Sequence, residues 1–184
     1  SSAASDVYKR QQQACSVIQI AGTNGKGSTA IMVDALLRTA GLRVGRYCSP
    51  HLVDVNERIC IDGRPISHGL FDETWRQIEP MVGMVDAQRI DGIDMTFFEV
   101  MTAMAFAAFA DAPVDVAVVE VGLGGRWDAT NVADANVAVV TPVAMDHMRI
   151  LGNSIDKIAA EKAGIIKPGC IPVIAGQEAE AAPV

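Results

Sequence analysis

The sequence predicts an α/β fold in which helices flank a mostly parallel sheet. Short apolar runs alternate with segments of helical spacing along most of the chain, and glycine-rich turns follow two of those runs. This alternation is typical of strands joined by helical crossovers. Hydrophobic residues make up 50% of the 184 residues, enough for one well-buried core and for a single domain or slightly more.

The first half of the chain is expected to form three strands and two helices. An apolar run stopped by Gly22 predicts the first strand, and i, i+4 apolar spacing before Gly41 predicts the first helix. A run ended by Ser49-Pro50 and an alternating segment predict two more strands, followed by a helix. The expected ranges are strand 17–21, helix 27–40, strands 44–48 and 57–62, and a helix within 67–84.

The second half begins with the most apolar stretch of the chain, Val100–Ala110. It is far shorter than the roughly 20 residues of a membrane span, so we expect a buried helix and no membrane crossing. Apolar runs then predict three strands, and helical spacing predicts one helix between them. The expected ranges are helix 96–110, strands 114–121 and 136–141, helix 154–164 and strand 171–175.

Net charge and cysteine content narrow the possible partners. The formal net charge is −7, so we expect neither a nucleic-acid cradle nor binding to an anionic membrane. A local site for an anionic small ligand stays compatible with that charge. The four cysteines form no CxxC pair, which favours reduced thiols in the cytoplasm over a zinc site or a disulfide framework.

Both ends differ from the middle of the chain. Residues 1–16 contain a low-complexity start and a run of three glutamines. We interpret this leader as an artefact or as a frayed native segment, and expect it to be disordered. The domain is therefore expected over residues 17–175. Residues 176–184 are expected to be a truncated tail of an incomplete sheet, because no helix follows the last strand.

The strongest motif is the string Gly22-Thr23-Asn24-Gly25-Lys26-Gly27-Ser28-Thr29, between a predicted strand and a predicted helix. Glycines let backbone N–H groups approach a phosphate chain, and the helix N-terminus favours anions. Lys26 would hold the β- and γ-phosphates, and Ser28 offers a hydroxyl to Mg²⁺. The spacing departs from the usual P-loop pattern. An ordinary glycine-rich turn with an exposed lysine is the alternative.

Three further groups of residues follow predicted strands or lie on a helix. Glu120 ends the most apolar strand and begins a glycine-rich loop, where a carboxylate beside a bound cation such as Mg²⁺ is favourable. Asp146-His147 follows the next strand, and Lys162 lies near a helix end. Ordinary polar roles are the alternatives: a solvated Glu120, a hydrogen-bonded His147 and a solvated Lys162.

Taken in order, the motifs resemble those of folylpolyglutamate synthases and bifunctional dihydrofolate synthases, within the wider Mur ligase family. The matching strings cover residues 17–175, and their joint occurrence is specific. They are Gly22–Ser28, Ser49–Leu52, Asn56–Ile59, Phe98-Glu99, Glu120–Arg126, Asp128–Asn131, Asp146-His147 with Leu151-Gly152, and Glu161–Ile165.

The resemblance implies an ATP-dependent ligase that forms a carbon–nitrogen bond. ATP would phosphorylate a carboxylate of folate or dihydropteroate, and the amino group of L-glutamate would attack the acyl phosphate. The implied fold is part of a P-loop-type Mur ligase central domain, with a C-terminal Rossmann-like domain absent. Cytoplasmic location, small-molecule partners and a monomeric full-length enzyme are implied as well.

The resemblance also assigns roles to residues. ATP would lie on Thr23, Asn24, Gly25, Lys26, Gly27, Ser28 and Thr29. Ser28 and Glu120 would bind one Mg²⁺. His147 would bind a second metal ion beside a carbamylated Lys162, and Lys26, His147 and Lys162 would be the catalytic residues. Ser49, Pro50, His51 and Asp128 match regions that contact the pterin.

Two departures concern the folate side: Trp127 replaces a usual Leu, and Cys48 replaces a usual Thr or Ser. They leave open the choice between dihydropteroate and folate. Two other functions also stay open. One is a different P-loop kinase or ligase, which would give Asp128–Asn131 and Asp146-His147 no role. The other is a non-catalytic nucleotide-binding module, which would give His147 and Lys162 none.

Overall fold

The computed structural model describes residues 11–89, 92–147, 151–152 and 154–184. Most of the predicted leader, residues 1–10, lies outside the described residues. In chain order the elements are η1 (Gln11–Gln13), β1 (Ser16–Ala21), α2 (Lys26–Thr39), β2 (Val44–Tyr47), η2 (Val55–Arg58), β3 (Ile59–Ile61), β4 (Arg64–Pro65), α3 (His68–Ala87), α4 (Phe97–Asp111), β5 (Val116–Glu120), η4 (Ala129–Val132), β6 (Val137–Val140), α6 (Ile155–Ala163) and β7 (Ile171–Ile174).

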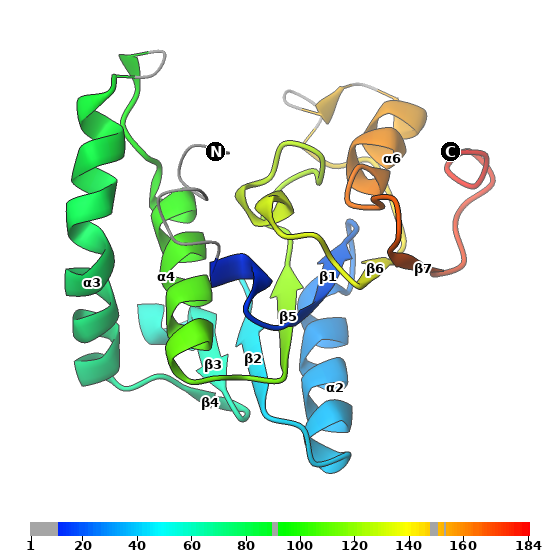
Figure 1. Ribbon diagram of the computed structural model, residues 1–184. Coiled ribbons are helices and arrows are strands. Elements are labelled where there is room, and N and C mark those ends of the chain that lie inside the picture. Colours follow the sequence, from blue (N-terminus) through cyan, green and yellow to red (C-terminus); the bar gives the residue numbers. More distant parts are fainter. Residues whose placement is uncertain (1–10, 90–91, 148–150, 153) are drawn as a thin grey trace.

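The strands form one seven-stranded sheet in the order β4-β3-β2-β5-β1-β6-β7 (Figure 1). The five strands from β2 to β7 in this order are parallel, and β3 and β4 add antiparallel pairs at one edge. The predicted fold class, a mostly parallel sheet flanked by helices, is confirmed. The short strand β4 was not predicted, because two residues leave no alternating pattern to detect.

Helices cover the two faces of the central strands. Successive residues of a strand point to opposite faces, so Val17 and Val119 pack with α4 while Ile20 and Val118 pack with α2. In Figure 1, α3 and α4 lie on one side of the sheet and α2 on the other. This coverage explains why the central strands read as continuous apolar runs rather than as alternating ones.

The predicted buried helix is α4, and its sequence fixes where it begins. Thr96 caps it, because its hydroxyl accepts from the Glu99 N–H while the Glu99 carboxylate accepts from the Thr96 N–H at 2.8 Å. Every residue from 101 to 109 is buried. No helix among the described residues combines the length and the hydropathy that crossing a bilayer requires.

Two stretches differ from their predictions. Residues 11–16 pack onto the domain instead of forming a loose leader: Gln12 is 7% exposed, Cys15 packs against the main core, and β1 begins at Ser16. The sequence gives no periodic pattern here, because the polar run forms one short 3₁₀ turn and buries a single side chain. The strand predicted over 57–62 is also shorter, because Asp54 and Glu57 form a capping box around η2.

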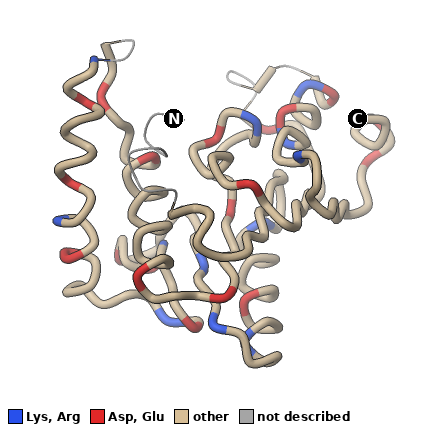
Figure 2. Tube along the Cα trace, in the orientation of Figure 1, with Lys and Arg blue, Asp and Glu red and all other residues tan. Residues whose placement is uncertain are grey.

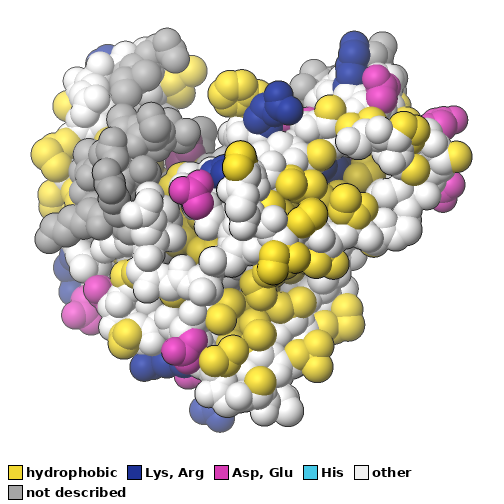
Figure 3. Space-filling model, turned by 45° about the vertical axis from the view of Figure 1, so that its right-hand side comes forward, with side chains coloured by type: hydrophobic (Ala, Val, Ile, Leu, Met, Phe, Trp, Pro, Cys, Tyr) yellow, Lys and Arg dark blue, Asp and Glu magenta, His cyan; other side chains and the backbone are white. Residues whose placement is uncertain are grey.

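The last residues lie at the far edge of the sheet. β7 is an edge strand whose residues are all exposed, as the sequence predicts for an open sheet. Beyond it, the Gln177 side chain accepts from the Val143 N–H at 2.9 Å, and Ala181 is buried against β6 and α6. The tail 176–184 therefore packs on the domain. Figure 3 shows hydrophobic side chains gathered on the side of the molecule that carries α2 and β7.

Candidate functional site

Four loops that carry predicted site residues meet at one edge of the sheet. They follow β2, β5, β1 and β6, which are consecutive and parallel in the strand order. The carboxyl ends of parallel strands lie together, and ligands of open α/β sheets bind there. The topology therefore brings together Ser49–Leu52, Glu120–Asn131, Gly22–Thr29 and Pro142–His147.

The glycine-rich loop after β1 begins at a very close approach to β6. Gly22 has φ +141°, and a side chain on it would collide with Thr141. The N–H groups of Thr23 and Asn24 both donate to the Pro142 carbonyl, at 3.1 and 3.3 Å. These two amides are occupied by the protein, and the contact of Thr23 and Asn24 with ATP stays a prediction.

The amides that remain for an anion belong to the start of α2. Gly25 is the N-cap with φ 83°, and the Thr29 N–H donates to its carbonyl. The N–H groups of residues 25–28 precede the helical ladder, so they point out of the helix N-terminus. Lys26 Nζ lies 3.4 Å from the Thr23 carbonyl, and Ser28 is exposed. This is the geometry of a phosphate-binding turn.

The Glu120 carboxylate lies against that same turn. The side chain is 5% exposed, and its Oε2 accepts from the Ser49 N–H at 3.2 Å. A Cβ on Gly27 would sit 3.4 Å from Oε2, so the carboxylate is in van der Waals contact with this turn. Burial raises the pKa of Glu120, while the Ser49 N–H and the Lys26 charge oppose that rise. A buried carboxylate beside a phosphate-binding turn fits a divalent cation.

Lys162 is buried rather than solvated, at 2% exposed. Its Nζ donates to the Gly22 carbonyl at 2.8 Å, which joins the end of α6 to the start of the glycine-rich loop. Burial lowers the pKa of Lys162 to about 8, and the Lys26 charge lowers it further, against the opposing charge of Asp146. The alternative of a solvated lysine is therefore wrong.

The surroundings of His147 differ from those of Lys162. Its side chain is exposed, its backbone has φ 47°, and its Nε2 lies 3.5 Å from Asp146 Oδ1. Over the described residues, no three His, Cys, Asp or Glu side chains gather closely enough to hold a metal ion. The described contacts do not join His147 to Glu120 or Ser28, and the predicted metal set stays a prediction.

The loop after β5 is built onto the end of α6. A Cβ on Gly125 would lie 2.7 Å from the Glu161 carbonyl oxygen and 2.8 Å from that of Lys162, so the two backbones touch there. The Arg126 N–H donates to the Glu161 carbonyl at 2.9 Å, and the Trp127 N–H to the Glu161 carboxylate at 3.2 Å. This contact fixes the position from which Lys162 reaches Gly22.

Asp128 shapes the same loop from within. Its carboxylate accepts from the Leu123 N–H at 2.9 Å and from the Thr130 hydroxyl at 2.6 Å. The Thr130 hydroxyl in turn accepts from Gln19 Nε2 at 3.0 Å. Burial raises the pKa of Asp128, and these hydrogen bonds oppose the rise. Thr130 lies in the predicted string Asp128–Asn131 without an assigned role, and Gln19 was not predicted, because a glutamine inside an apolar run carries no motif.

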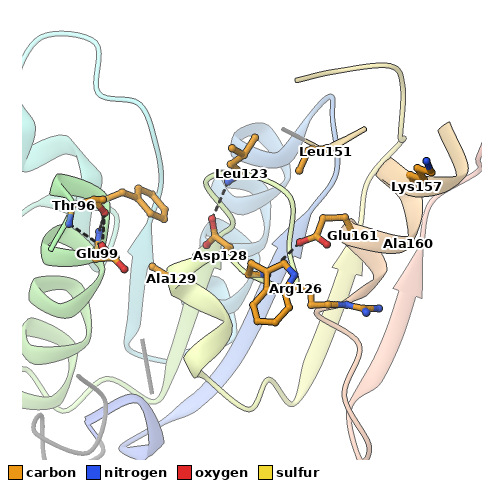
Figure 4. Close-up of a pocket in the computed structure, with 12 residues that line it drawn as sticks. Thr96, Glu99, Leu123, Arg126, Asp128, Ala129, Leu151, Lys157, Ala160 and Glu161 are labelled. Atoms are coloured by element: carbon orange, nitrogen blue, oxygen red, sulfur yellow. Dashed lines mark hydrogen bonds between the residues drawn. The ribbon is translucent and has the colours of Figure 1, made fainter. Parts of the chain in front are cut away.

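A cavity of about 670 Å³ opens between this loop, the start of α4 and the end of α6 (Figure 4). Asp128 lies beside Leu123 on its floor, Thr96 and Glu99 come from the α4 side, and Glu161 comes from α6. Phe98 adds an aromatic ring and Arg126 and Lys157 add cations. Aromatic, acidic and basic groups therefore line one concave site, a combination typical of small-molecule pockets.

The loop after β2 holds the other predicted pterin residues. His51 Nδ1 accepts from Arg58 Nε at 2.9 Å, and the Arg58 guanidinium lies over the Phe97 ring at 5.2 Å. Pro50 and Leu52 are exposed, and the Leu52 N–H donates to Glu57 at 2.8 Å. Ser49 contacts Glu120, so this loop reaches the phosphate side of the site. Its contact with a pterin stays a prediction.

Comparisons with known proteins agree with this geometry, although no protein-family model matches the chain. The chain is 57% identical over 170 residues to the dihydrofolate synthase/folylpolyglutamate synthase of Mycobacterium tuberculosis, covering 90% of this chain and 35% of that protein. It is 43% identical over 151 residues to the Escherichia coli protein of the same name, covering 82% and 34%.

A solved structure gives the same picture in three dimensions. Mycobacterium tuberculosis folylpolyglutamate synthase complexed with ADP superposes with a TM-score of 0.93 at 53% identity, covering 99% of this chain and 42% of that one. The chain thus spans about a third of the length of the curated relatives it matches. By sequence and by fold, it is a homologue of the folylpolyglutamate and dihydrofolate synthases over that part of their length.

Proposed function

We propose that the chain forms part of an ATP-dependent ligase that adds L-glutamate to a carboxylate of folate or dihydropteroate. One observation supports the proposal: the end of α6 borders both the cavity and the glycine-rich loop. Glu161 lines the cavity, and its neighbour Lys162 donates to the Gly22 carbonyl. We propose that an acid bound in the cavity directs its carboxylate toward a phosphate bound at the start of α2.

The chemistry that we propose is the one that the resemblance implies. The carboxylate oxygen attacks the γ-phosphorus and ADP leaves, giving an acyl phosphate. The glutamate amine then attacks the acyl carbon, phosphate leaves, and the amine gives up a proton. Such a reaction depends mainly on positioning and charge neutralisation. Lys26 and the amides of residues 25–28 supply both for the β- and γ-phosphates.

Mg²⁺ is proposed as the cation of the nucleotide. The buried Glu120 carboxylate and the Ser28 hydroxyl are oxygen donors, which Mg²⁺ prefers, and the carboxylate lies next to Gly27, the residue that precedes Ser28. When bound, the ion neutralises charge on the phosphates. Ser28→Ala should weaken the Mg²⁺ dependence of turnover more than it weakens folding.

We also propose the second metal site, at His147 and a carbamylated Lys162. A carbamate forms when a neutral amine attacks CO₂ and loses a proton, and a pKa of about 8 leaves a useful neutral fraction of Lys162 near neutral pH. The carbamate nitrogen keeps one hydrogen for the Gly22 carbonyl. Its oxygens would add anionic ligands where a free ammonium would repel a cation.

The remaining parts of the proposal concern partners and location. We propose a cytoplasmic protein, monomeric at full length, with small-molecule substrates and neither nucleic-acid nor membrane partners. Lys and Arg are interspersed with Asp and Glu along the chain, which supports the absence of a single basic face (Figure 2). The Mycobacterium tuberculosis relative was solved in complex with ADP, which supports a function that uses ATP.

The test is an assay of ADP release by the full-length protein. Release should require ATP, Mg²⁺, L-glutamate and either dihydropteroate or a reduced folate, and mass spectrometry should detect the glutamylated product. Release that is independent of glutamate would favour a different P-loop enzyme. Nucleotide binding without release would favour a non-catalytic module.

A further inference from the structure

Cys48 occupies a position that the proposed reaction leaves unexplained. In the parallel pair of β2 and β5, Tyr47 is in register with Val119. One residue further, Cys48 is therefore level with Glu120 and on the same face of the sheet, since side chains alternate along both strands. The face is the one covered by α2, because Cys48 packs there with Val118 and Ala30.

A buried polar network reaches Cys48 from α2. Asp34 is 2% exposed, and its carboxylate accepts from Arg46 Nε at 3.1 Å. Arg46 Nη1 lies 3.5 Å from Cys48 Sγ, and Nη2 lies 3.2 Å from Cys60 Sγ. The sulfur of Cys48 therefore accepts from a guanidinium whose own position is fixed by an ion pair.

The Glu120 carboxylate is the nearest partner that the β2–β5 register gives to the thiol of Cys48. Burial raises the pKa of Cys48 and Glu120 raises it further, and because a carboxylate can only accept, the thiol is the donor that we assign to this pair. Glu120 Oε2 also accepts from the N–H of Ser49, the next residue. The residues after β2 thus hold the carboxylate through one backbone donor, and they place the Cys48 thiol beside it.

We propose that Cys48 is a positioning residue for Glu120: it holds the carboxylate in the orientation that faces the start of α2, and Arg46 fixes the thiol in turn. This inference rests on the proposed function of Glu120 as a ligand of the nucleotide's Mg²⁺. Removing the thiol leaves part of a buried carboxylate without a donor, so the carboxylate turns and the cation binds less tightly.

Cys60 provides a matched control. It is a buried cysteine on the neighbouring strand and contacts the same Arg46 guanidinium. Its other contact is the Glu57 carbonyl at 3.5 Å, and Glu120 is not among the groups that act on it. A general loss of packing or of the Arg46 contact should affect Cys48→Ala and Cys60→Ala alike, whereas loss of positioning should affect only Cys48→Ala.

The test measures ATP turnover by the full-length protein as a function of Mg²⁺ concentration. Cys48→Ala should raise the Mg²⁺ concentration for half-maximal turnover about 10-fold with little change in kcat. Cys48→Ser, which keeps a donor, should restore it, and Cys60→Ala should leave it unchanged. An unshifted titration for Cys48→Ala, equal shifts for the two alanine variants, or no rescue by serine would overturn the inference.

Glu120→Gln separates this inference from the function on which it rests. A normal Mg²⁺ titration for Glu120→Gln would overturn the metal role of Glu120 itself. A shifted titration for Glu120→Gln beside a normal one for Cys48→Ala would overturn only the role of Cys48.

Discussion

Lys162 Nζ donates to the Gly22 carbonyl at 2.8 Å across 140 positions of sequence. The bond ties the last helix of the chain to the first turn of the glycine-rich loop. Both partners are buried, so the bond is made in a medium where an unpaired group is costly. The first three predictions concern this bond, the glycine-rich loop, or the end of α6 that carries Lys162.

The first prediction concerns Lys26. Lys26→Ala in the full-length protein should lower ATP turnover by about 100-fold or more, because the lysine is the mobile cation of the phosphate-binding turn. The melting temperature should stay unchanged, since the described contact of Lys26 is one long hydrogen bond within its own loop. Arg76→Ala, at an exposed cation on α3, is the control and should leave turnover intact. Turnover near wild type in Lys26→Ala would remove the phosphate-binding interpretation.

The second prediction concerns the contact between the loop after β5 and α6. Gly125→Ala places a methyl group against two backbone carbonyl oxygens, and backbone cannot yield as a flexible side chain does. Chemical denaturation should show a loss of about 2 kcal/mol or more in the free energy of unfolding. Gly83→Ala is the control: Gly83 lies inside α3 with open space around it, so its variant should gain about 0.5–1 kcal/mol. Equal effects of the two substitutions would contradict the close approach.

The third prediction is a pH dependence. The pKa of Lys162 falls from 10.5 to about 8 on folding, so between these values the unfolded chain binds more protons than the folded one. The free energy of unfolding should therefore rise with pH across this window. Below about pH 8 the folded protein bears the whole cost of burying the charged Lys162 side chain.

The measurement compares wild type with Lys162→Met by urea denaturation at pH 7 to 10.5, in CO₂-free buffer so that the amine stays free. Across this pH window, the free energy of unfolding of the wild type should rise by about 3 kcal/mol relative to that of the variant. Parallel curves would show that Lys162 is not buried as described.

How far the sequence predicts this site depends on the kind of signal. The glycine-rich loop, Glu120 and the buried helix α4 follow from local patterns, because apolar runs and glycine turns directly reflect strand ends and close approaches. The Lys162–Gly22 bond does not follow, because an Nζ 140 positions away is placed by packing rather than by spacing. The same holds for the Gln19–Thr130–Asp128 chain, where ordinary polar residues meet only after the sheet has formed.

The fourth prediction concerns the open edge at β7. The 184-residue chain should self-associate through this edge, because its residues are exposed and apolar. Residues 171 and 175 donate to β6, so the alternate residues 172 and 174 face outward, and Pro172 has no N–H to offer. Association should therefore be weak, with a mass by light scattering that rises with concentration. Ile174→Lys should suppress it, and a strict monomer at high concentration would contradict the prediction.

The central claim is that ATP activates a carboxylate of the pterin substrate, and oxygen transfer tests it most directly. The full-length protein is supplied with ATP, L-glutamate and a folate or dihydropteroate labelled with ¹⁸O in the reacting carboxylate. The acyl phosphate route predicts one ¹⁸O atom in each inorganic phosphate released. The labelled oxygen that attacked phosphorus leaves with the phosphate when the glutamate amine attacks the acyl carbon. Glutamylated product accompanied by unlabelled phosphate would contradict the claim.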